Sequence, residues 1–215
     1  MKLTQNKMPV PFTYQEQLTA ALHKWFKNSN LHEGVSLYSF SQLKNGKMKN
    51  ASLDFELGSD FFISCWETDT IKTLVKSIRE NPEVCFGMEV KELIIQDDPD
   101  LSNLEYFRVG SPILIHRIRE NKHAFYYYDD NCAGQLLTET IITKMGKANI
   151  EKDEELHIEF DKHYNNPLKK RINYKGISNP VSVCPVIIRG ENATKQFIWN
   201  VGLGNSTGIG FGAIY

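Results

Sequence analysis

Apolar residues recur at helical spacing in two places in the first half of the chain. Leu18, Leu22, Trp25 and Phe26 follow one face of a helix predicted over about 14–28. Farther along, a second stripe predicts a helix that begins at Thr68 or Asp69. The stripe consists of Ile71, Leu74, Val75 and Ile78, and the helix is expected to stop at Asn81-Pro82.

Strands are predicted around these helices, because apolar runs alternate with turn residues. They are expected at Ser36–Leu43, Ala51–Glu56, Phe61–Trp66 and Val84–Ile95, with a hairpin turn at Asn45-Gly46. The resulting βαββαβ order is that of a ferredoxin-like unit. Its first strand should precede Pro9, where eight residues are available. Either that strand is a stub or the chain begins late.

A second pass of similar elements follows the acidic segment Asp97-Asp98-Pro99-Asp100, which is the best linker candidate. Strands are expected at Tyr106–Ile115, Phe125–Tyr128, 155–161 and 181–189, and helices at 134–145 and 192–201. The sequence therefore predicts an α+β fold of two tandem ferredoxin-like (RRM-like) domains, at residues 1–100 and 101–215.

Composition agrees with a globular cytoplasmic protein. The four cysteines lie far apart without a C-x-x-C pair, which favours reduced thiols. No apolar run is long enough to span a membrane. The net charge is −1, but residues 162–195 hold seven basic residues and one acid, a local basic field.

The last residues are unusually rich in glycine. Five glycines fall within Gly202–Gly212, and apolar residues flank the segment on both sides. Glycine at this density lets backbones approach closely and can turn consecutive N–H groups toward an anion. We therefore expect an ordered, phosphate-facing loop, not a mobile tail. Its candidate RNA-binding residues are Gly202, Gly204, Asn205, Ser206, Thr207, Gly208 and Gly210.

This ending resembles the C-terminal signature of the CRISPR repeat-processing endoribonucleases, which belong to the repeat-associated RNA-binding superfamily. The resemblance extends to most of the chain. It is carried by Pro185–Tyr215 with its GLG…GIGFG ending, Phe12-Thr13-Tyr14-Gln15, Leu31-His32-Glu33-Gly34, Leu37–Ser41 and Gly110–Ile113.

Two histidines are the candidate catalytic residues. On a helical wheel His23 lies about 130° from the apolar stripe, and His32 follows the same helix in a loop. Each alone could be an ordinary surface side chain, whereas two near one helix end could serve as acid and base. The resemblance implies that His32 is catalytic and that His23 holds the position of the base. Which is base and which is acid stays open.

The resemblance implies RNA cleavage without a metal or cofactor. The 2′-OH would attack the neighbouring phosphorus and leave a 2′,3′-cyclic phosphate and a 5′-OH. Some family members have a phosphate-stabilising lysine where this chain has Ser36. Lys27 or Lys47, or else Lys44 or Lys49, would have to replace it, unless the site does without one.

The remaining candidates concern binding. Lys169, Lys170, Arg171 and Lys175 sit where the family presents a basic hairpin to RNA, and A-form RNA is gripped through its backbone. Tyr126–Tyr128 could stack on bases, although strand alternation should send one or two into the core. The implied partners are CRISPR repeat RNA, with a homodimer or an effector complex left open.

Two other functions stay open. One is a non-catalytic repeat-RNA-binding module on the same scaffold, which the missing lysine at Ser36 supports. The other is a ferredoxin-like protein that binds a different ligand and has no affinity for repeat RNA.

Overall fold

A computed structural model describes residues 1–27 and 34–215 and shows an α+β fold, as the sequence predicts. The helices of this part are α1 (Gln15–Phe26), α2 (Thr68–Glu80), α3 (Ala133–Lys147), α4 (Asn192–Val201) and the short 3₁₀ helix η2 (Thr207–Ile209). Most strands are short and all their pairings are antiparallel. None of the described helices has both the length and the apolar character needed to cross a membrane.

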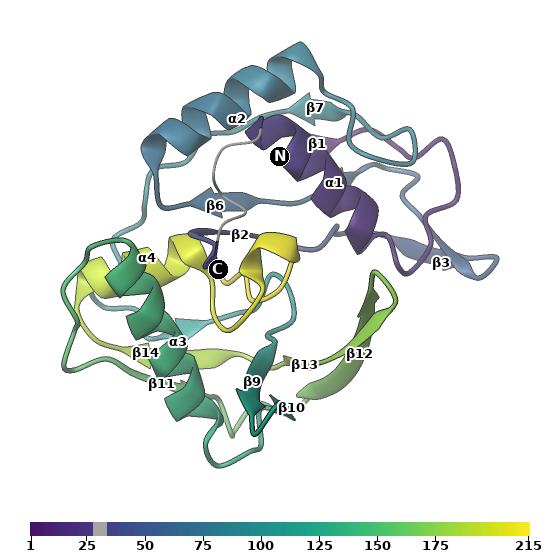
Figure 1. Ribbon diagram of the computed structural model, residues 1–215. Coiled ribbons are helices and arrows are strands. Elements are labelled where there is room, and N and C mark those ends of the chain that lie inside the picture. The colour runs from purple at the N-terminus through teal and green to yellow at the C-terminus, as the bar shows by residue number, and fades with distance from the viewer. Residues whose placement is uncertain (28–33) are drawn as a thin grey trace.

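The strands of the N-terminal half are β1 (Lys2–Leu3), β2 (Tyr38–Phe40), β3 (Lys47–Lys49), β4 (Ser52–Asp54), β5 (Ser59–Asp60), β6 (Ile63–Cys65) and β7 (Val90–Glu92). The two-residue β1 lies between β5 and β7, so the strand before Pro9 exists and is a stub. Helices α1 and α2 pack against each other (Figure 1). Their buried residues, with those of the strands, form one core drawn from residues 3–88.

The hairpin turn predicted at Asn45-Gly46 is wrong. Strand β2 pairs with β6, and the hairpin is β3–β4, which turns at Asn50-Ala51. Both turn residues have positive φ, 49° and 58°. A two-residue type I′ turn needs that conformation, and Asn-Gly is its strongest sequence signal. Alanine at its second position gives no such signal.

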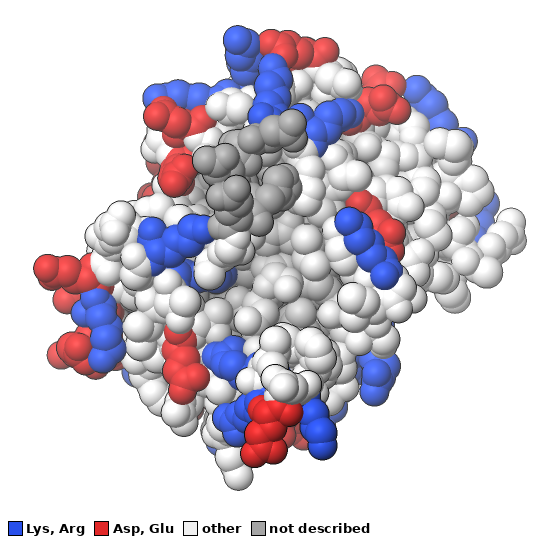
Figure 2. Space-filling view, viewed as in Figure 1, with Lys and Arg blue, Asp and Glu red and all other residues white. Residues whose placement is uncertain are grey.

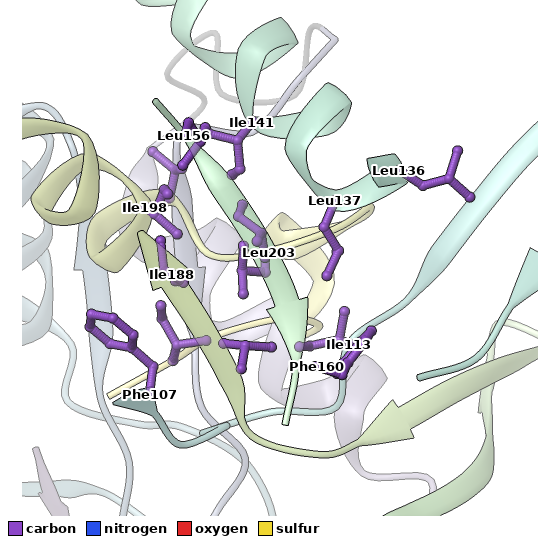
Figure 3. Packing of buried hydrophobic residues seen from close by; sticks show 14 of the residues in the cluster. Phe107, Ile113, Leu136, Leu137, Ile141, Leu156, Phe160, Ile188, Ile198 and Leu203 are labelled. Carbon is purple, nitrogen blue, oxygen red and sulfur yellow. The ribbon is translucent and has the colours of Figure 1, made fainter. Parts of the chain in front are cut away.

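The strands of the C-terminal half are β8 (Tyr106–Phe107), β9 (Ile115–Arg119), β10 (Lys122–Tyr126), β11 (His157–Phe160), β12 (Leu168–Tyr174), β13 (Ile177–Val183) and β14 (Val186–Arg189). Strands β11, β14 and β8 form one sheet in that order. Side chains of α3, α4 and this sheet interlock in a second core, whose buried members come from residues 101–214 (Figure 3).

Three long strands predicted from apolar runs are interrupted. Val84–Ile95 contains a turn at Phe86-Gly87, where both φ angles are positive, and only β7 is regular. Residues 181–189 divide into the end of β13 and β14 around Pro185, which has no N–H to donate to a neighbouring strand. For Tyr106–Ile115 the sequence already predicts an interruption at Ser111-Pro112, and the regular strand before it is the two-residue β8.

Two hairpins project from the C-terminal half (Figure 1). The β9–β10 hairpin, which turns at Glu120-Asn121, was not predicted. The longer β12–β13 hairpin turns at Lys175-Gly176 and carries the predicted basic residues, so these do lie on a hairpin. Its tip reaches α1, where the backbone N–H of Lys175 donates to a carboxylate oxygen of Glu16.

Candidate functional site

The glycine segment is ordered and joins the two halves of the molecule. Helix η2 within it packs on α1 and β2 of the N-terminal half. Gln15 Nε2 on α1 donates to the Ile209 carbonyl at 2.6 Å, and Gly212 N–H donates to the Pro112 carbonyl at 2.8 Å. The loop therefore forms part of the seam between α1 and the C-terminal half (Figure 1).

Close packing explains the glycines of this segment. A Cβ on Gly208 would lie 2.4 Å from Ser36 Oγ and 2.9 Å from the Tyr38 hydroxyl oxygen. A Cβ on Gly204 would lie 2.4 Å from the Leu114 carbonyl oxygen. All the glycines of the segment are buried. Within residues 202–214, Ser206 is the one exposed residue. Contact of the segment with RNA stays a prediction.

His23 lies in the last turn of α1 and is half-buried beside the glycine segment. Its Nε2 is 3.4 Å from the hydroxyl oxygen of Tyr38, and that hydroxyl donates to the Gly208 carbonyl at 3.0 Å. The phenol has a single hydrogen, so while its hydroxyl donates to Gly208 it can only accept a hydrogen bond from the ring of His23. The contact therefore holds the imidazole beside the glycine segment.

Tyr38 is a fixed support for this histidine. Its side chain is almost completely buried, and its ring packs on Phe26 with centroids 4.7 Å apart. Burial raises the pKa of the Tyr38 phenol well above its ordinary value, so the hydroxyl stays neutral at physiological pH. It can therefore orient His23 and does not compete with it as a base.

His32 lies outside the described residues, and its pairing with His23 stays a prediction. The described chain resumes at Gly34, close to the end of α3. Lys147 Nζ lies 3.2 Å from the place where a Cβ on Gly34 would be. The C-terminal half therefore brings a cation to the segment that follows His32.

The lysines proposed to stand in for the missing one are mostly engaged elsewhere. Lys27 pairs with Glu80 at 2.7 Å, and Lys49 pairs with Asp54 and Glu56. Lys44 Nζ lies 4.4 Å from the ring centroid of Tyr215. Lys47 is exposed on β3, at the outer edge of the N-terminal half and away from η2 (Figure 1). A phosphate-stabilising role for Lys27 or Lys47 stays a prediction.

The basic residues of the hairpin lie on both of its faces. Lys169 pairs with Asp129 at 2.7 Å and lies over the ring of Tyr127, 4.8 Å from its centroid. Lys170 and Arg171 are exposed neighbours on β12, so they point to opposite faces. Tyr126 and Tyr128 pack against the core, as strand alternation predicted for one or two of the three tyrosines.

A cavity of about 420 Å³ opens between α3, β9 and residues 204–207 of the glycine segment. It lies on the face that Figure 2 shows, where a hollow separates the two halves and basic side chains border it at several points. Ser36 of the N-terminal half closes one side. This hollow is the candidate nucleic-acid interface.

Two basic residues of this cavity were missed as site residues. Lys144 is fully buried, and its Nζ donates to the carbonyls of Val201 and Gly202 and to Thr207 Oγ1. Arg117 donates to the Leu136 carbonyl at 2.6 Å and to Thr140 Oγ1 at 3.0 Å. The sequence does not reveal these contacts, because the partners just named lie 19 or more positions away.

Within residues 1–27 and 34–215, no three His, Cys, Asp or Glu side chains converge in a way that could hold a metal ion. In the acidic linker, Asp98 accepts a hydrogen bond from Asn200 Nδ2 at 3.0 Å. That contact ties the linker to α4.

The comparisons with known proteins concern the fold and the family. No curated protein matches the chain. A solved structure of a CRISPR-associated protein Cas6 superposes with a TM-score of 0.81 at 18% identity, over 100% of this chain and 96% of the other. A Cas6-related protein from Pyrococcus furiosus gives a TM-score of 0.82 at 19% identity, over 100% and 95%.

A third solved structure, a RAMP protein binding different RNA substrates, gives a TM-score of 0.78 at 19% identity, over 99% of this chain and 96% of the other. At identities this low, the TM-scores establish a shared fold and nothing more. The family model described as CRISPR associated protein Cas6, C-terminal, matches residues 96–215, which is more than half of the chain. The chain therefore belongs to the Cas6 family of CRISPR-associated pre-crRNA processing proteins.

Proposed function

We propose that this protein is an endoribonuclease that binds CRISPR repeat RNA and cleaves it to produce guide RNA. The observation that carries the proposal is the contact of His23 with Tyr38, which is itself fixed by Gly208. This contact places an imidazole of the N-terminal half beside a backbone loop of the C-terminal half. Family membership and the RNA-binding RAMP protein of the same fold support RNA as the substrate.

The proposed chemistry is general acid–base catalysis. His23 takes the proton of the 2′-OH, the 2′-oxygen attacks phosphorus, and His32 protonates the departing 5′-oxygen. The products are a 2′,3′-cyclic phosphate and a 5′-hydroxyl, and the protons balance between the two imidazoles. Each such group typically contributes about 10²–10⁴-fold to the rate. Imidazoles can perform both proton transfers without a metal ion.

The proposed architecture is a pair of ferredoxin-like domains, at residues 1–100 and 101–215. The two separate hydrophobic cores and the sheet order β11–β14–β8 are consistent with that division. RNA would lie in the hollow between them, with the β12–β13 hairpin holding its backbone through Lys169, Lys170, Arg171 and Lys175. A location in the cytoplasm fits this function.

Replacement of each histidine tests the proposal. The variants His23→Ala and His32→Ala should bind repeat RNA with nearly wild-type affinity and lose cleavage by about 10²-fold or more. Affinity is measured by fluorescence anisotropy and cleavage in single-turnover reactions. Cleavage at the wild-type rate in both variants would contradict the proposed acid and base.

A non-catalytic RNA-binding module is the second candidate, and Ser36 favours it. Ser36 occupies the position where some family members have a lysine, and it packs against Gly208. The same assay decides between the two functions, because a binding module would hold repeat RNA but leave it uncut in the wild type.

A further inference from the structure

The β9–β10 hairpin carries two histidines whose rings lie against each other. Nε2 of His116 is 2.6 Å from Nδ1 of His123, and the ring centroids are 4.8 Å apart with planes inclined by 18°. A contact this short between ring nitrogens needs a hydrogen on one ring and a lone pair on the other. Neither ring takes part in the cleavage proposed for His23 and His32.

The register of the hairpin brings both rings to one face. His123 is directly opposite Ile118, and Phe125 is directly opposite His116. Residues that are directly opposite share a face, and neighbours along a strand alternate between faces. These four side chains therefore lie together on one face of the hairpin, and Ile118 among them is 64% exposed.

The basic residues of the hairpin alternate with the histidines and belong to the other face. Arg117 donates to the Leu136 carbonyl of α3 at 2.6 Å, and Arg119 lies over the ring of Tyr126, 5.8 Å from its centroid. Lys122 is directly opposite Arg119. Within residues 115–126, the face with the two imidazoles thus holds no Lys or Arg side chain that would repel a cation.

The fold fixes one of the two rings and leaves the other adjustable. The backbone N–H of His116 donates to Asn205 Oδ1 at 2.8 Å, and its ring lies 5.0 Å from the ring centroid of Phe125. Phe125 in turn packs on a buried cluster of Leu114, Val181 and Phe211. His123 is exposed, so its ring can turn until the lone pairs of both imidazoles converge on one point.

The distance between the rings suits a metal ion that binds nitrogen ligands at right angles. With metal–nitrogen bonds of about 2.0–2.1 Å, two ligand nitrogens lie about 2.9 Å apart at a right angle and about 3.3 Å apart in a tetrahedron. The observed 2.6 Å is closer to the first value. Imidazole ligands at right angles are typical of Ni²⁺ and Cu²⁺, whereas Zn²⁺ prefers the tetrahedron.

We propose that His116 and His123 form a surface site for a late first-row divalent cation, with Ni²⁺ and Cu²⁺ preferred to Zn²⁺. The cation takes the place of the hydrogen between the rings, and that hydrogen moves to the other nitrogen of its own ring, so both imidazoles bind as neutral ligands. Water fills the remaining positions, since no three His, Cys, Asp or Glu side chains converge in the described residues. The bound ion joins β9 to β10 and stabilises the hairpin.

Titration of the untagged protein with NiCl₂ tests the site. Calorimetry gives the affinity, and the backbone amide NMR signals of residues 115–126 show where the ion binds. His116→Gln and His123→Gln should each weaken Ni²⁺ binding by about tenfold or more, because the second imidazole then no longer binds within the same molecule. His157→Gln is the matched control, since His157 is exposed on β11, in a different sheet, and its loss should leave the affinity unchanged.

The double replacement of His116 and His123 separates a shared site from two independent ones. If both imidazoles hold one ion, the double variant binds no more weakly than either single variant, because each single change already leaves one isolated ligand. Losses that add in the double variant, or Ni²⁺ binding that survives it, would overturn the proposal. Absence of saturable Ni²⁺ binding in the wild type would overturn it as well.

Ile118→His provides a test that gains affinity. Ile118 is directly opposite His123 on the same face, so a third imidazole there should tighten Ni²⁺ binding by about tenfold or more. Unchanged affinity in this variant would contradict the placement of the ion between the strands. In the wild type Cu²⁺ should bind more tightly than Ni²⁺ and Ni²⁺ more tightly than Zn²⁺. Tighter binding of Zn²⁺ than of Ni²⁺ would contradict the right-angle geometry.

Discussion

The Tyr38 hydroxyl is the smallest unit on which the proposed chemistry depends. It contacts His23 on one side and the Gly208 carbonyl on the other, and it comes from a strand that neither of them belongs to. The Tyr38 hydroxyl oxygen therefore links the orientation of the imidazole to the position of the glycine segment. Orientation of a base in this way contributes to the rate more than to stability.

Replacement of Tyr38 by phenylalanine removes that oxygen and keeps the buried ring. We expect cleavage to fall by about tenfold or more because His23 loses its support, while the free energy of unfolding falls by only about 1 kcal/mol. Tyr14→Phe is the control. Its hydroxyl is also buried but accepts a hydrogen bond from the Leu43 N–H, and it does not contact His23. Similar cleavage in the two variants would contradict the role of Tyr38.

Gly208 sets the distance between the glycine segment and β2. In Gly208→Ala the new methyl group would overlap Ser36 Oγ, so the loop must shift. We expect a loss of about 1–3 kcal/mol in the free energy of unfolding and a parallel loss of cleavage. Gly146→Ala is the control, because no atom lies within 4 Å of the added Cβ. In helix α3 that change should stabilise the protein by up to about 1 kcal/mol.

The sequence predicts His23 and the glycine segment but not the contact between them. His23 leaves the apolar stripe of α1, and the density of glycines marks close packing, so each can be recognised alone. Their meeting depends on Tyr38, which reads in sequence as one more apolar residue of a strand. Lys144 is similar, since nothing in its helix reveals acceptors that lie 57 to 63 positions later.

At the scale of elements, the helices were predicted better than the strands. α4 runs over Asn192–Val201 as expected, because its apolar spacing and its position before glycine are local signals. Strands such as β1 and β8 have only two residues, and their pairing is decided by distant partners. Apolar runs also continue through turns, as at Phe86-Gly87, where the chain remains buried or half-buried without being a strand.

Helix α3 holds the glycine segment through the buried Lys144, which makes this contact sensitive to pH. Below about pH 7 the ammonium is charged in both folded and unfolded states, and the fold bears the cost of burying it. Between about pH 7 and its ordinary pKa of 10.5, the unfolded chain binds a proton that the fold does not, so stability rises with pH.

Lys144→Met removes this titration. The unfolding free energy of the wild type minus that of the variant should rise from about pH 6 to about pH 10. Chemical denaturation at several pH values measures it, and the subtraction cancels other titrating groups. A difference that is constant or moves the other way would show that Lys144 does not titrate in the fold.

The β12–β13 hairpin is expected to bind RNA through its charges. The plot of log affinity against log salt concentration has a negative slope. Lys170→Gln and Arg171→Gln should each make that slope less steep by about 0.7–0.9 if each residue contacts one phosphate. Lys72→Gln is the matched control, because Lys72 pairs with Asp69 on α2 at the outer side of the molecule (Figure 1). An unchanged slope in both hairpin variants would remove the hairpin from the interface.

At the scale of the whole molecule, the proposed active site exists only where the two halves meet. The N-terminal half supplies the histidines, and the C-terminal half supplies the loop, the hairpin and the buried cations. The hairpin tip and the glycine segment both contact α1, and Ser39 of β2 donates to the Asn200 carbonyl of α4, so several contacts hold the seam. RNA that lies along this seam would meet groups from both halves at one phosphate.

The most direct test of this account is the cleavage of repeat RNA in the presence of EDTA, on two substrates that differ only in the sugar before the cut. The account predicts that the ribose substrate is cleaved to a 2′,3′-cyclic phosphate and a 5′-hydroxyl, and that the 2′-deoxy substrate is bound but uncut. Cleavage of the 2′-deoxy substrate, or loss of all cleavage in EDTA, would contradict it.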